Sequence, residues 1–493
     1  MEHMTKRLLT QYPDIGQVTS IISEIRSRDL EDTGDSGEAT EGDDKYRPAI
    51  LVLAILYKLQ ERNDEFFRNG GESLEAEEHS QSLGVLGHYW HQQHDIGKML
   101  REGINKTSSQ EDIRKLVEKN KQTMKETLGL EMVKVSVSEL CLGDKNALVS
   151  SSKQLSTHCP DFTVHLSPGH KAVVLTVLGT RIFPRPSSQD IIMDLACRPQ
   201  PFLGGQAHGG MVIGHNNLVK FALPCIIEQL SSHPDFSLLI VGYSLGAALA
   251  QLFLLDLKHG GLKSSIPDKV RVRGLLYGCP PVYAGPLSVT EDILMVSNHN
   301  DGVTGASLRN CHDVVLKSRA IKNLNIRRRD LLKMALNINN GELEEESLKS
   351  IMDEEEDDSG EAEDGSESSG KIGTFLKRTK SKVVKMFGDS TYELWDGLQL
   401  AVENIPSSKH PQLTYAGEHL LVLKKGKTDE KQRRLSKFCG DQNLKRFSKQ
   451  IRLKYSMMDH HMPWSYNALF SGIYFQCILK YSSDFCFRCG GER

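Results

Sequence analysis

A serine between two glycines has the clearest chemical potential in this sequence of 493 residues. Gly242, Ser244 and Gly246 form the pattern G-x-S-x-G, with an apolar run before it and an Ala- and Leu-rich run after it. In a strand–turn–helix of this kind a sharp turn holds the serine hydroxyl up to solvent, and the glycines let the strand and helix backbones approach each other. We therefore predict that Ser244 is a nucleophile on a nucleophile elbow.

A serine nucleophile needs a base that takes its proton and an acid that orients the base. After a nucleophile elbow the acid and the base follow in that order along the chain, each in a loop after a later strand. Asp301 directly follows the predicted strand Ile293–Ser297, whereas Asp292 precedes this strand and Asp313 lies a dozen residues further on. Asp301 is therefore the predicted acid.

Two adjacent histidines are candidates for the base. His460 and His461 are the histidines that follow the last predicted strand, Leu420–Leu423, and they lie in an expected loop just before the final helix. His419 falls at the start of that strand instead. The spacing of the residues does not choose between His460 and His461.

Backbone N–H groups would have to hold the negative charge that develops when the serine attacks. One of them usually belongs to the residue after the nucleophile, here Leu245, and another comes from a loop after an early strand. The predicted strand Ala172–Leu178 leads into Gly179 and Thr180. We therefore predict that the N–H groups of Leu245 and Thr180 form an oxyanion hole.

Short β-branched runs recur from residue 163 onward and supply the strands that such a site needs. They are Thr163–Leu166, Ala172–Leu178, Ser237–Val241, Val270–Tyr277, Ile293–Ser297 and Leu420–Leu423. Helical patterns lie between several of them, including Met211–Leu230 and Ala247–Lys258. Strands that are apolar throughout and alternate with helices indicate an α/β fold with a mostly parallel central sheet.

The first 150 residues are predicted to form a helical region without a catalytic constellation. Ser108 and Glu111 have the spacing of a capping box, and Gly129 is placed to end the helix that follows. Three histidines at helical spacing could seat a metal ion, but no carboxylate or cysteine completes the set, so a hydrated helix face is favoured and no metal site is predicted. These histidines are His88, His91 and His94.

A charged segment between residues 317 and 408 interrupts the alternation of strands and helices. Glu342–Ser369 carries 14 acidic residues against one lysine, a composition that cannot bury enough apolar surface to fold alone. We therefore predict a largely disordered insertion before the last strand. The predicted parts are a helical N-terminal region (1–150), the first part of the α/β domain (151–316), the insertion (317–408), the last strand with the base (409–480) and a tail (481–493).

The overall charge is nearly balanced, with 61 basic against 64 acidic residues. Basic residues are nevertheless concentrated in Lys317–Lys333, Lys371–Lys385 and Lys424–Lys454. These segments predict either peripheral contact with an anionic membrane surface or an autoinhibitory flap that pairs with the acidic run. No recognition motif for nucleic acid accompanies the basic residues, so nucleic acid is not an expected partner.

Compartment and membrane attachment are predicted from hydropathy and cysteines. The longest apolar stretches, such as Ala49–Tyr57, are about half the ~20 residues of a membrane-spanning helix, and no signal-peptide pattern opens the chain. The ten cysteines are scattered without framework spacing, which favours a reducing compartment. We therefore expect a cytoplasmic protein that associates with membranes peripherally.

Six motifs together resemble the class 3 (fungal-type) lipase family, most closely its sn-1-specific diacylglycerol lipases, over residues of about 160–315 and 413–475. The motifs are Val173–Thr180, Ala207–Met211, Gly242–Ala248, Tyr277–Val282, Asn298–Val303 and His461–Tyr466. The resemblance implies an α/β-hydrolase fold with Ser244 as nucleophile, Asp301 as acid and His461, rather than His460, as base. This chain departs from the family pattern at Leu178, where the family usually has arginine, and at His460, where it usually has aspartate.

The resemblance also implies a function. We expect a serine lipase that hydrolyses an acyl ester of membrane glycerolipid, in particular diacylglycerol to monoacylglycerol and fatty acid. A phospholipase A1 or a carboxylesterase with the same triad is an alternative, and a catalytically inactive lipid-binding scaffold is another. No cofactor is expected to be required, and only the resemblance to the family would suggest a dependence on calcium.

Overall fold

The computed structural model describes residues 56, 72–73, 76–104, 108–137, 158–182, 187–287, 290–323, 408–424, 433–438, 441–449, 451 and 457–470. The predictions for the acidic run, for Lys371–Lys385 and for the tail lie outside these residues. The other two basic segments are described only in part.

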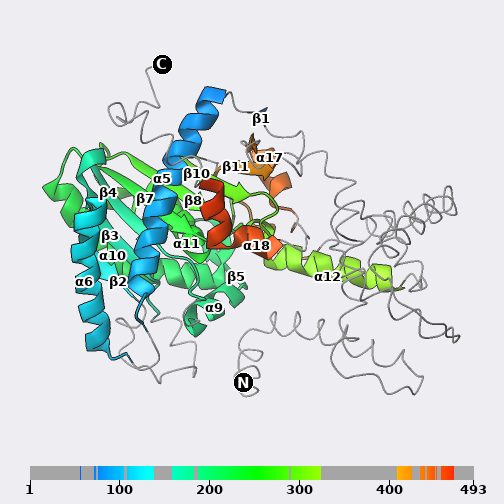
Figure 1. Ribbon diagram of the computed structural model, residues 1–493. Helices are drawn as coiled ribbons and strands as arrows, with labels where there is room; N and C mark the ends of the chain where they lie inside the picture. The colour runs from blue at the N-terminus through cyan, green and yellow to red at the C-terminus, as the bar shows by residue number, and fades with distance from the viewer. Residues whose placement is uncertain are drawn as a thin grey trace, which may run out of the picture. The chain divides into compact units, whose positions relative to one another are not determined.

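A nine-stranded sheet forms the centre of the described structure (Figure 1). Its strands, in spatial order, are β1 (Glu72–Ser73), β12 (Arg433–Phe438), β11 (Gly417–Lys424), β10 (Thr290–Asn298), β8 (Val272–Tyr277), β7 (Ser237–Tyr243), β4 (Ala172–Val177), β3 (Phe162–Ser167) and β2 (Glu131–Ser136). The neighbours from β11 to β4 pair in parallel, and the pairs outside them are antiparallel. A small antiparallel sheet holds β5 (Pro199–Phe202), β6 (Gly205–His208) and β9 (Tyr283–Ala284).

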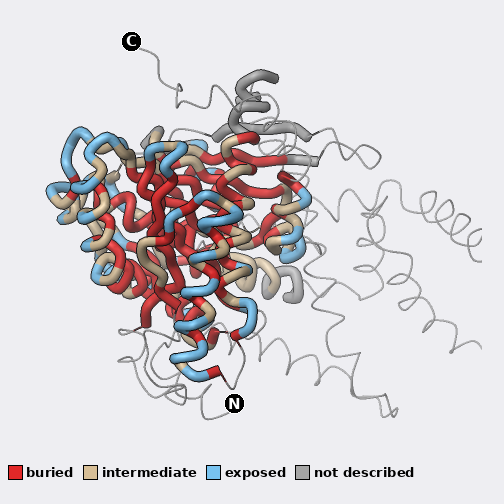
Figure 2. The backbone as a smooth tube through the Cα atoms, turned by 60° about the vertical axis from the view of Figure 1, so that its left-hand side comes forward, coloured by how far each residue is buried: buried red, intermediate tan, exposed pale blue. Residues whose placement is uncertain are grey.

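Helices cover both faces of the large sheet. The described helices include α5 (Ala76–Arg101), α6 (Gln110–Leu128), α9 (Ser188–Leu195), α10 (Gly209–Ser232), α11 (Leu245–His259), α17 (Asp441–Phe447), α18 (Met457–His461) and a helical segment at 463–470, and α12 (Leu308–Asn323) follows η3 (Val303–Gly305) along the chain. Short 3₁₀ turns are η1 (Pro168–His170), η2 (Lys263–Ser265) and η3 (Val303–Gly305). Figure 2 shows the buried residues gathered in the interior of the described structure, with the exposed residues on its outside.

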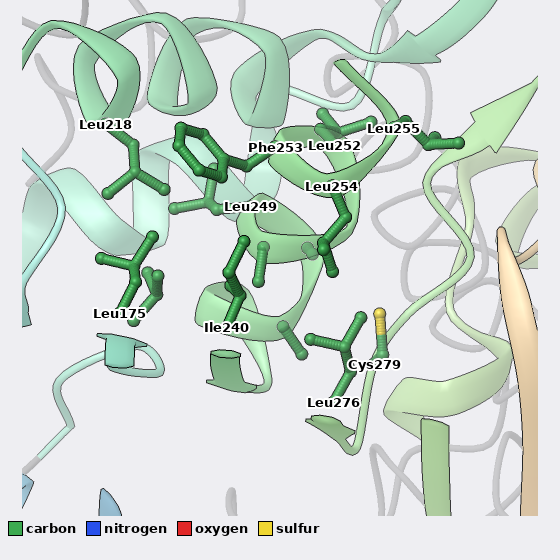
Figure 3. Packing of buried hydrophobic residues seen from close by; sticks show 14 of the residues in the cluster. Leu175, Leu218, Ile240, Leu249, Leu252, Phe253, Leu254, Leu255, Leu276 and Cys279 are labelled. Atoms are coloured by element: carbon green, nitrogen blue, oxygen red, sulfur yellow. The ribbon is translucent and has the colours of Figure 1, made fainter. Parts of the chain in front are cut away.

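Side chains of the parallel strands alternate between two apolar layers, as the period of two of a β-strand requires. Leu175 of β4 and Ile240 of β7 pack with α10 and α11 in one cluster, where Phe253 and Leu249 meet them (Figure 3). On the other face of the sheet, Val174, the neighbour of Leu175 in β4, packs with α5 and with the helical segment 463–470. Strands that are buried on both faces explain why the sequence reads as continuous apolar runs.

This three-layer arrangement, with a mostly parallel sheet and a serine at a strand–helix turn, is the α/β-hydrolase fold and confirms the predicted fold class. The six predicted strands correspond to β3, β4, β7, β8, β10 and β11. Their apolar, β-branched composition was sufficient to predict them, because each of these strands has a neighbouring strand on both sides in the sheet.

The polar strands of the sheet were missed. β2 lies within the region predicted to be helical, yet it is a strand that pairs antiparallel with β3. β12 lies within the basic segment Lys424–Lys454 and pairs antiparallel with β11. Only one strand contacts β2, and the two-residue β1 is the outer neighbour of β12, so neither strand needs a long apolar run.

Two helix boundaries also differ from the prediction. The capping box of α6 is formed by Ser109 and Asp112, one residue later than predicted: Ser109 Oγ accepts from the Asp112 N–H over 3.1 Å, and Asp112 Oδ2 accepts from the Ser109 N–H over 2.9 Å. Gly129 ends this helix in the left-handed conformation, as predicted. Helix α12 continues through Lys317, the predicted start of the insertion, to Asn323.

By its internal packing the chain divides into two units. One comprises Met1–Ile22, Asp64–His312 and Ser408–Arg493, and the other comprises Ser23–Asn63 and Asp313–Ser407. Within the described residues, one helix, α10, has the length and apolar composition of a membrane span, and 56% of its most apolar window is buried inside the structure. Its buried residues pack against the sheet, as in a core helix.

Candidate active site

The turn between β7 and α11 holds Ser244 in a strained conformation, with φ of 55° and ψ of −123°. Its two flanking glycines are required by close backbone contacts. A Cβ atom at Gly246 would lie 2.2 Å from the carbonyl oxygen of Val177, and one at Gly242 would lie 2.6 Å from the carbonyl oxygen of Gly246. A positive φ at a non-glycine residue costs free energy, and such strain is found at functional sites. The backbone around Ser244 therefore has the strained strand–turn–helix geometry that a nucleophile elbow requires.

The structure brings Ser244, His461 and Asp301 into one hydrogen-bonded chain. His461 Nε2 lies 2.8 Å from Ser244 Oγ, and His461 Nδ1 lies 3.0 and 2.9 Å from the two oxygens of the Asp301 carboxyl group. An ionised carboxylate only accepts hydrogen bonds, so Nδ1 carries the hydrogen and Nε2 is free to accept from the serine. This is the arrangement of a nucleophile, a base and an orienting acid.

Asp301 is held by donors on more than one side. The residue is fully buried, and its carboxylate accepts from the Val303 N–H over 2.9 Å and from the Tyr466 hydroxyl over 2.8 Å, in addition to His461. The other two candidate acids are elsewhere: Asp292 pairs with Lys258, and Asp313 lies on α12. Of the three aspartates, the structure places Asp301 beside the histidine.

His461 lies at the end of α18, whereas a loop was expected. The ring of Tyr243 stacks on the His461 ring with centroids 5.3 Å apart, and the Tyr243 hydroxyl donates to the His461 carbonyl oxygen. The neighbouring His460 instead packs edge-on against His299, and Asn298 Nδ2 donates to its carbonyl oxygen. The structure thus joins His461, and not His460, to Ser244.

The loop after β4 lies against the nucleophile. A Cβ atom at Gly179 would be 3.2 Å from Ser244 Cβ, so this loop passes directly beside the serine. Leu245 is the first residue of α11, and N–H groups in the first turn of a helix have no partner within the helix. These placements are compatible with the predicted donors, the N–H groups of Thr180 and Leu245.

Asp194 of α9 holds the side chain of Thr180. Thr180 Oγ1 donates to Asp194 Oδ2 over 2.7 Å. Burial raises the pKa of the Asp194 carboxyl to about 7, against the lowering effect of the Thr180 hydrogen bond, and the nearby Asp190 adds to the increase. The protonation of Asp194 therefore changes close to neutral pH, next to the predicted oxyanion hole.

Sequence reasoning missed the role of Trp90. This fully buried side chain contacts Tyr243 and Tyr466, with ring centroids 5.2 and 4.9 Å away, and its Nε1–H donates to Asn467 over 2.6 Å. It therefore packs behind the two tyrosines that contact His461 and Asp301. The sequence feature that could have indicated this contact is a single tryptophan among the histidines of a predicted helix.

The three histidines around Trp90 do not converge on a metal. Burial lowers the pKa of His88 to about 4, with like-charge repulsion from His170 and His91 adding to it, and burial also lowers the pKa of His91. His94 Nε2 lies 3.3 Å from Asn467 Nδ2. Within the part of the chain that the structure describes, no group of three or more His, Cys, Asp or Glu side chains could hold a metal ion.

Comparison with known proteins gives two kinds of similarity. Residues 174–311 match the family model described as "Lipase (class 3)". Lipases of Rhizopus niveus and Rhizopus oryzae are each 32% identical over 91 residues, which is 18% of this chain and 23% of theirs. The chain thus spans about a quarter of the length of these curated relatives.

Two lipases of fungi are among the solved structures to which the chain is similar. The lipase of Rhizopus microsporus var. chinensis is 19% identical, with a TM-score of 0.30 over 48% of this chain and 70% of that chain. The triacylglyceride lipase of Rhizomucor miehei is 14% identical, with a TM-score of 0.31 over 47% and 75%. The family-model match covers the segment that runs from β4 into α12, which carries Ser244 and Asp301.

Proposed function

We propose that this protein is a serine hydrolase that cleaves a carboxylic ester of membrane glycerolipid, with diacylglycerol as the substrate and its sn-1 ester as the bond cleaved. The observation that carries the proposal is the chain of hydrogen bonds from Ser244 through His461 to Asp301, with the serine on a strained elbow. The choice of diacylglycerol is supported by the sequence resemblance to sn-1-specific diacylglycerol lipases.

In the proposed mechanism Ser244 Oγ attacks the ester carbonyl carbon while His461 Nε2 takes the hydroxyl proton. The carbonyl oxygen becomes an oxyanion and accepts from the N–H groups of Leu245 and Thr180. When the carbonyl re-forms, the C–O bond to the glycerol oxygen breaks and His461 gives its proton to that oxygen, which releases monoacylglycerol. Water, deprotonated by His461, then attacks the acyl carbon, the bond from that carbon to Ser244 Oγ breaks, and His461 returns the proton to Ser244 Oγ, which releases the fatty acid and regenerates the enzyme. Asp301 keeps the imidazole oriented throughout.

Exposed apolar side chains around the triad support a lipid substrate over a small soluble ester. Among the described residues, the large hydrophobic side chains that are exposed all belong to segments that flank the site. Ile182 lies two residues after Thr180, and α9 holds Thr180 through Asp194. The exposed side chains are Ile182 after the loop that holds Thr180, Ile191 and Leu195 on α9, and Met458 and Trp464 on either side of His461. Such a surface favours contact with acyl chains or a membrane.

Peripheral attachment to an anionic membrane through the basic segments is part of the proposal. Each basic residue near an anionic leaflet adds about 1 kcal/mol of attraction before screening. Residues 317–323 of the first segment belong to α12, and residues 433–438 of the third form β12. An autoinhibitory flap formed by the insertion is the alternative role for these segments.

Labelling with a fluorophosphonate probe tests the proposed activity. We expect the wild-type protein to be labelled, and Ser244→Ala and His461→Ala to lose the label, because the probe reacts with an activated serine. His460→Ala is the matched control and should keep it. Labelling that persists in Ser244→Ala would contradict the proposal.

A substrate panel then tests the lipid class. Vesicles that contain diacylglycerol, phosphatidylcholine or phosphatidylserine are compared with a soluble butyrate ester, with the released fatty acid as the readout. Preferential release from the sn-1 position of diacylglycerol supports the proposed substrate. Preferential release from phospholipid would indicate the phospholipase A1 alternative. Preferential cleavage of the soluble ester would indicate the carboxylesterase.

A further inference from the structure

Each residue of the loop Leu178–Arg181, which we call the oxyanion loop, is held by a separate partner. The Leu178 N–H donates to the Asp161 carbonyl oxygen over 2.9 Å, and Thr180 donates to Asp194 as described above. The Arg181 N–H donates to Asp190 Oδ2 over 3.0 Å. The partner of Gly179 comes from α5: Arg101 Nη2 donates to the Gly179 carbonyl oxygen over 2.9 Å.

Arg101 is fixed in this position by a second contact. The same nitrogen lies 3.2 Å from Asp161 Oδ2, and the side chains of Arg101 and Asp161 are only 16% and 3% exposed. A guanidinium with so little exposure is weakly screened by solvent. Arg101 therefore presents a constant positive charge and a directed N–H donor to one carbonyl group of the oxyanion loop.

The spacing of α5 explains how a helix from outside residues 174–311 reaches this loop. Trp90, Gly97 and Arg101 follow each other at intervals of seven and four residues, so they lie on one face of the helix. Gly97 lies next to Leu178, because a Cβ atom at Gly97 would be 3.4 Å from Leu178 Cδ2. The same face thus packs behind Tyr243 and Tyr466 at Trp90 and against the oxyanion loop at Arg101. Figure 1 shows α5 lying along the sheet beside the C-terminal helices.

The Gly179 carbonyl and the Thr180 N–H belong to the same peptide unit. A trans peptide is planar, and its C=O and N–H bonds point in opposite directions. A donor that fixes the carbonyl from one side consequently fixes the direction of the N–H on the other side. A hydrogen bond to the carbonyl oxygen also polarises the peptide, which makes its N–H a stronger donor.

We propose that Arg101 is a positioning residue for the oxyanion hole, which orients and polarises the Thr180 N–H through the Gly179–Thr180 peptide unit. This inference rests on the proposed function, because it assigns Thr180 as an oxyanion donor. The oxyanion exists in the transition state and not in the bound ester, so Arg101 contributes to kcat and not to KM.

The test compares variants of the full chain with a soluble butyrate ester as substrate and an alkyl trifluoromethyl ketone as inhibitor. Ser244 adds to such a ketone and leaves an oxyanion in the same place as the tetrahedral intermediate. We expect Arg101→Met to lower kcat about ten-fold and to weaken inhibition by a similar factor, with KM unchanged. Lys98→Met is the matched control, because it removes a cation from the same turn of α5, where Lys98 is 64% exposed. It should keep wild-type values.

A conservative variant covers the case in which Arg101→Met does not fold. In Arg101→Lys the charge remains, but the ammonium is one bond closer to the backbone than Nη2 and cannot occupy the same point between Asp161 and Gly179. We expect it to lower kcat and ketone affinity about three-fold at temperatures where circular dichroism shows it to be folded.

The outcomes separate this inference from the proposed function. Ester hydrolysis that depends on Ser244, together with wild-type kcat and ketone affinity in a folded Arg101→Met or Arg101→Lys protein, would overturn the inference alone. It would leave Arg101 as a structural ion pair. Hydrolysis that persists in Ser244→Ala would overturn both.

Discussion

The hydroxyl group of Tyr466 lies 2.8 Å from Oδ2 of Asp301 and 3.2 Å from the backbone nitrogen of Asn298. Because the backbone N–H can only donate, the hydroxyl accepts from Asn298 and donates to the carboxylate. Burial and the Asp301 carboxylate hold the pKa of Tyr466 well above its usual value of 10.0, so the hydroxyl keeps its proton at neutral pH. Tyr466 thus connects Asp301 to the helical segment that follows His461.

The first prediction concerns this hydroxyl. Tyr466→Phe removes one donor to a buried carboxylate, and a hydrogen bond to a charged group is worth about 1.5–3 kcal/mol. We expect kcat/KM for a soluble ester to fall ten-fold or more and the urea midpoint of unfolding to decrease. Tyr283→Phe is the control, since its hydroxyl donates to the Leu203 carbonyl oxygen away from the triad. An unchanged kcat/KM in Tyr466→Phe would contradict the prediction.

Tyr243 is expected to position His461 in two ways, through ring stacking and through the hydrogen bond to the backbone. Tyr243→Phe keeps the stacking and loses a neutral hydrogen bond worth about 0.5–1.5 kcal/mol, so kcat should fall about two- to ten-fold. Tyr243→Leu loses both contacts and should reduce kcat further. Steady-state kinetics of the two variants measure whether kcat falls further in Tyr243→Leu than in Tyr243→Phe. A Tyr243→Leu protein as active as the wild type would show that the contact does not position the histidine.

The raised pKa of Asp194 predicts a pH dependence of stability. Because the folded pKa of about 7 lies above the ordinary value of 3.8, the folded state binds the proton more tightly than the unfolded state. This group therefore stabilises the fold below pH 4, and its contribution is lost as the pH rises through 7. We expect the melting temperature of Asp194→Asn minus that of the wild type to increase as the pH is raised from 4 to 8.

The control for this prediction is Asp268→Asn, which changes an exposed carboxylate. Its melting temperature should follow that of the wild type across the same range. A constant difference between Asp194→Asn and the wild type at all pH values would mean that Asp194 does not titrate in this interval.

The elbow makes a further prediction about stability. A methyl group at Gly246 would clash with the backbone of Val177, which cannot move without displacing β4. Gly246→Ala should therefore lower the free energy of unfolding by about 3 kcal/mol, at the upper end of overpacking effects. Gly261→Ala is the matched control, because no atom lies within 4 Å of a Cβ there. Urea titrations compare the two, and equal stability would contradict the prediction.

Runs of apolar residues in the sequence were sufficient to predict the strands in the interior of the sheet. The predicted strand that ends before Asp301 is β10, and the predicted strand before Ser244 is β7, because strands buried on both faces must be apolar throughout. β2 and β12 could not be recognised in this way. Each is held by backbone pairing at the outer part of the sheet, which leaves little trace in composition.

The sequence by itself determined the elbow, the order of Ser244 before Asp301, and the position of Asp301 after a strand, since these depend on glycine, on apolar runs and on chain order. The spacing of the residues left His460 and His461 equivalent, the resemblance to the class 3 lipases implied His461, and no sequence pattern assigned a role to α5. The tertiary structure joins His461 to Ser244 and places α5 beside the residues of the site. Distance along the chain does not constrain contacts between a helix near residue 90 and loops near residues 179 and 461. Packing of helix faces on the folded sheet brings Arg101, Trp90 and the triad together.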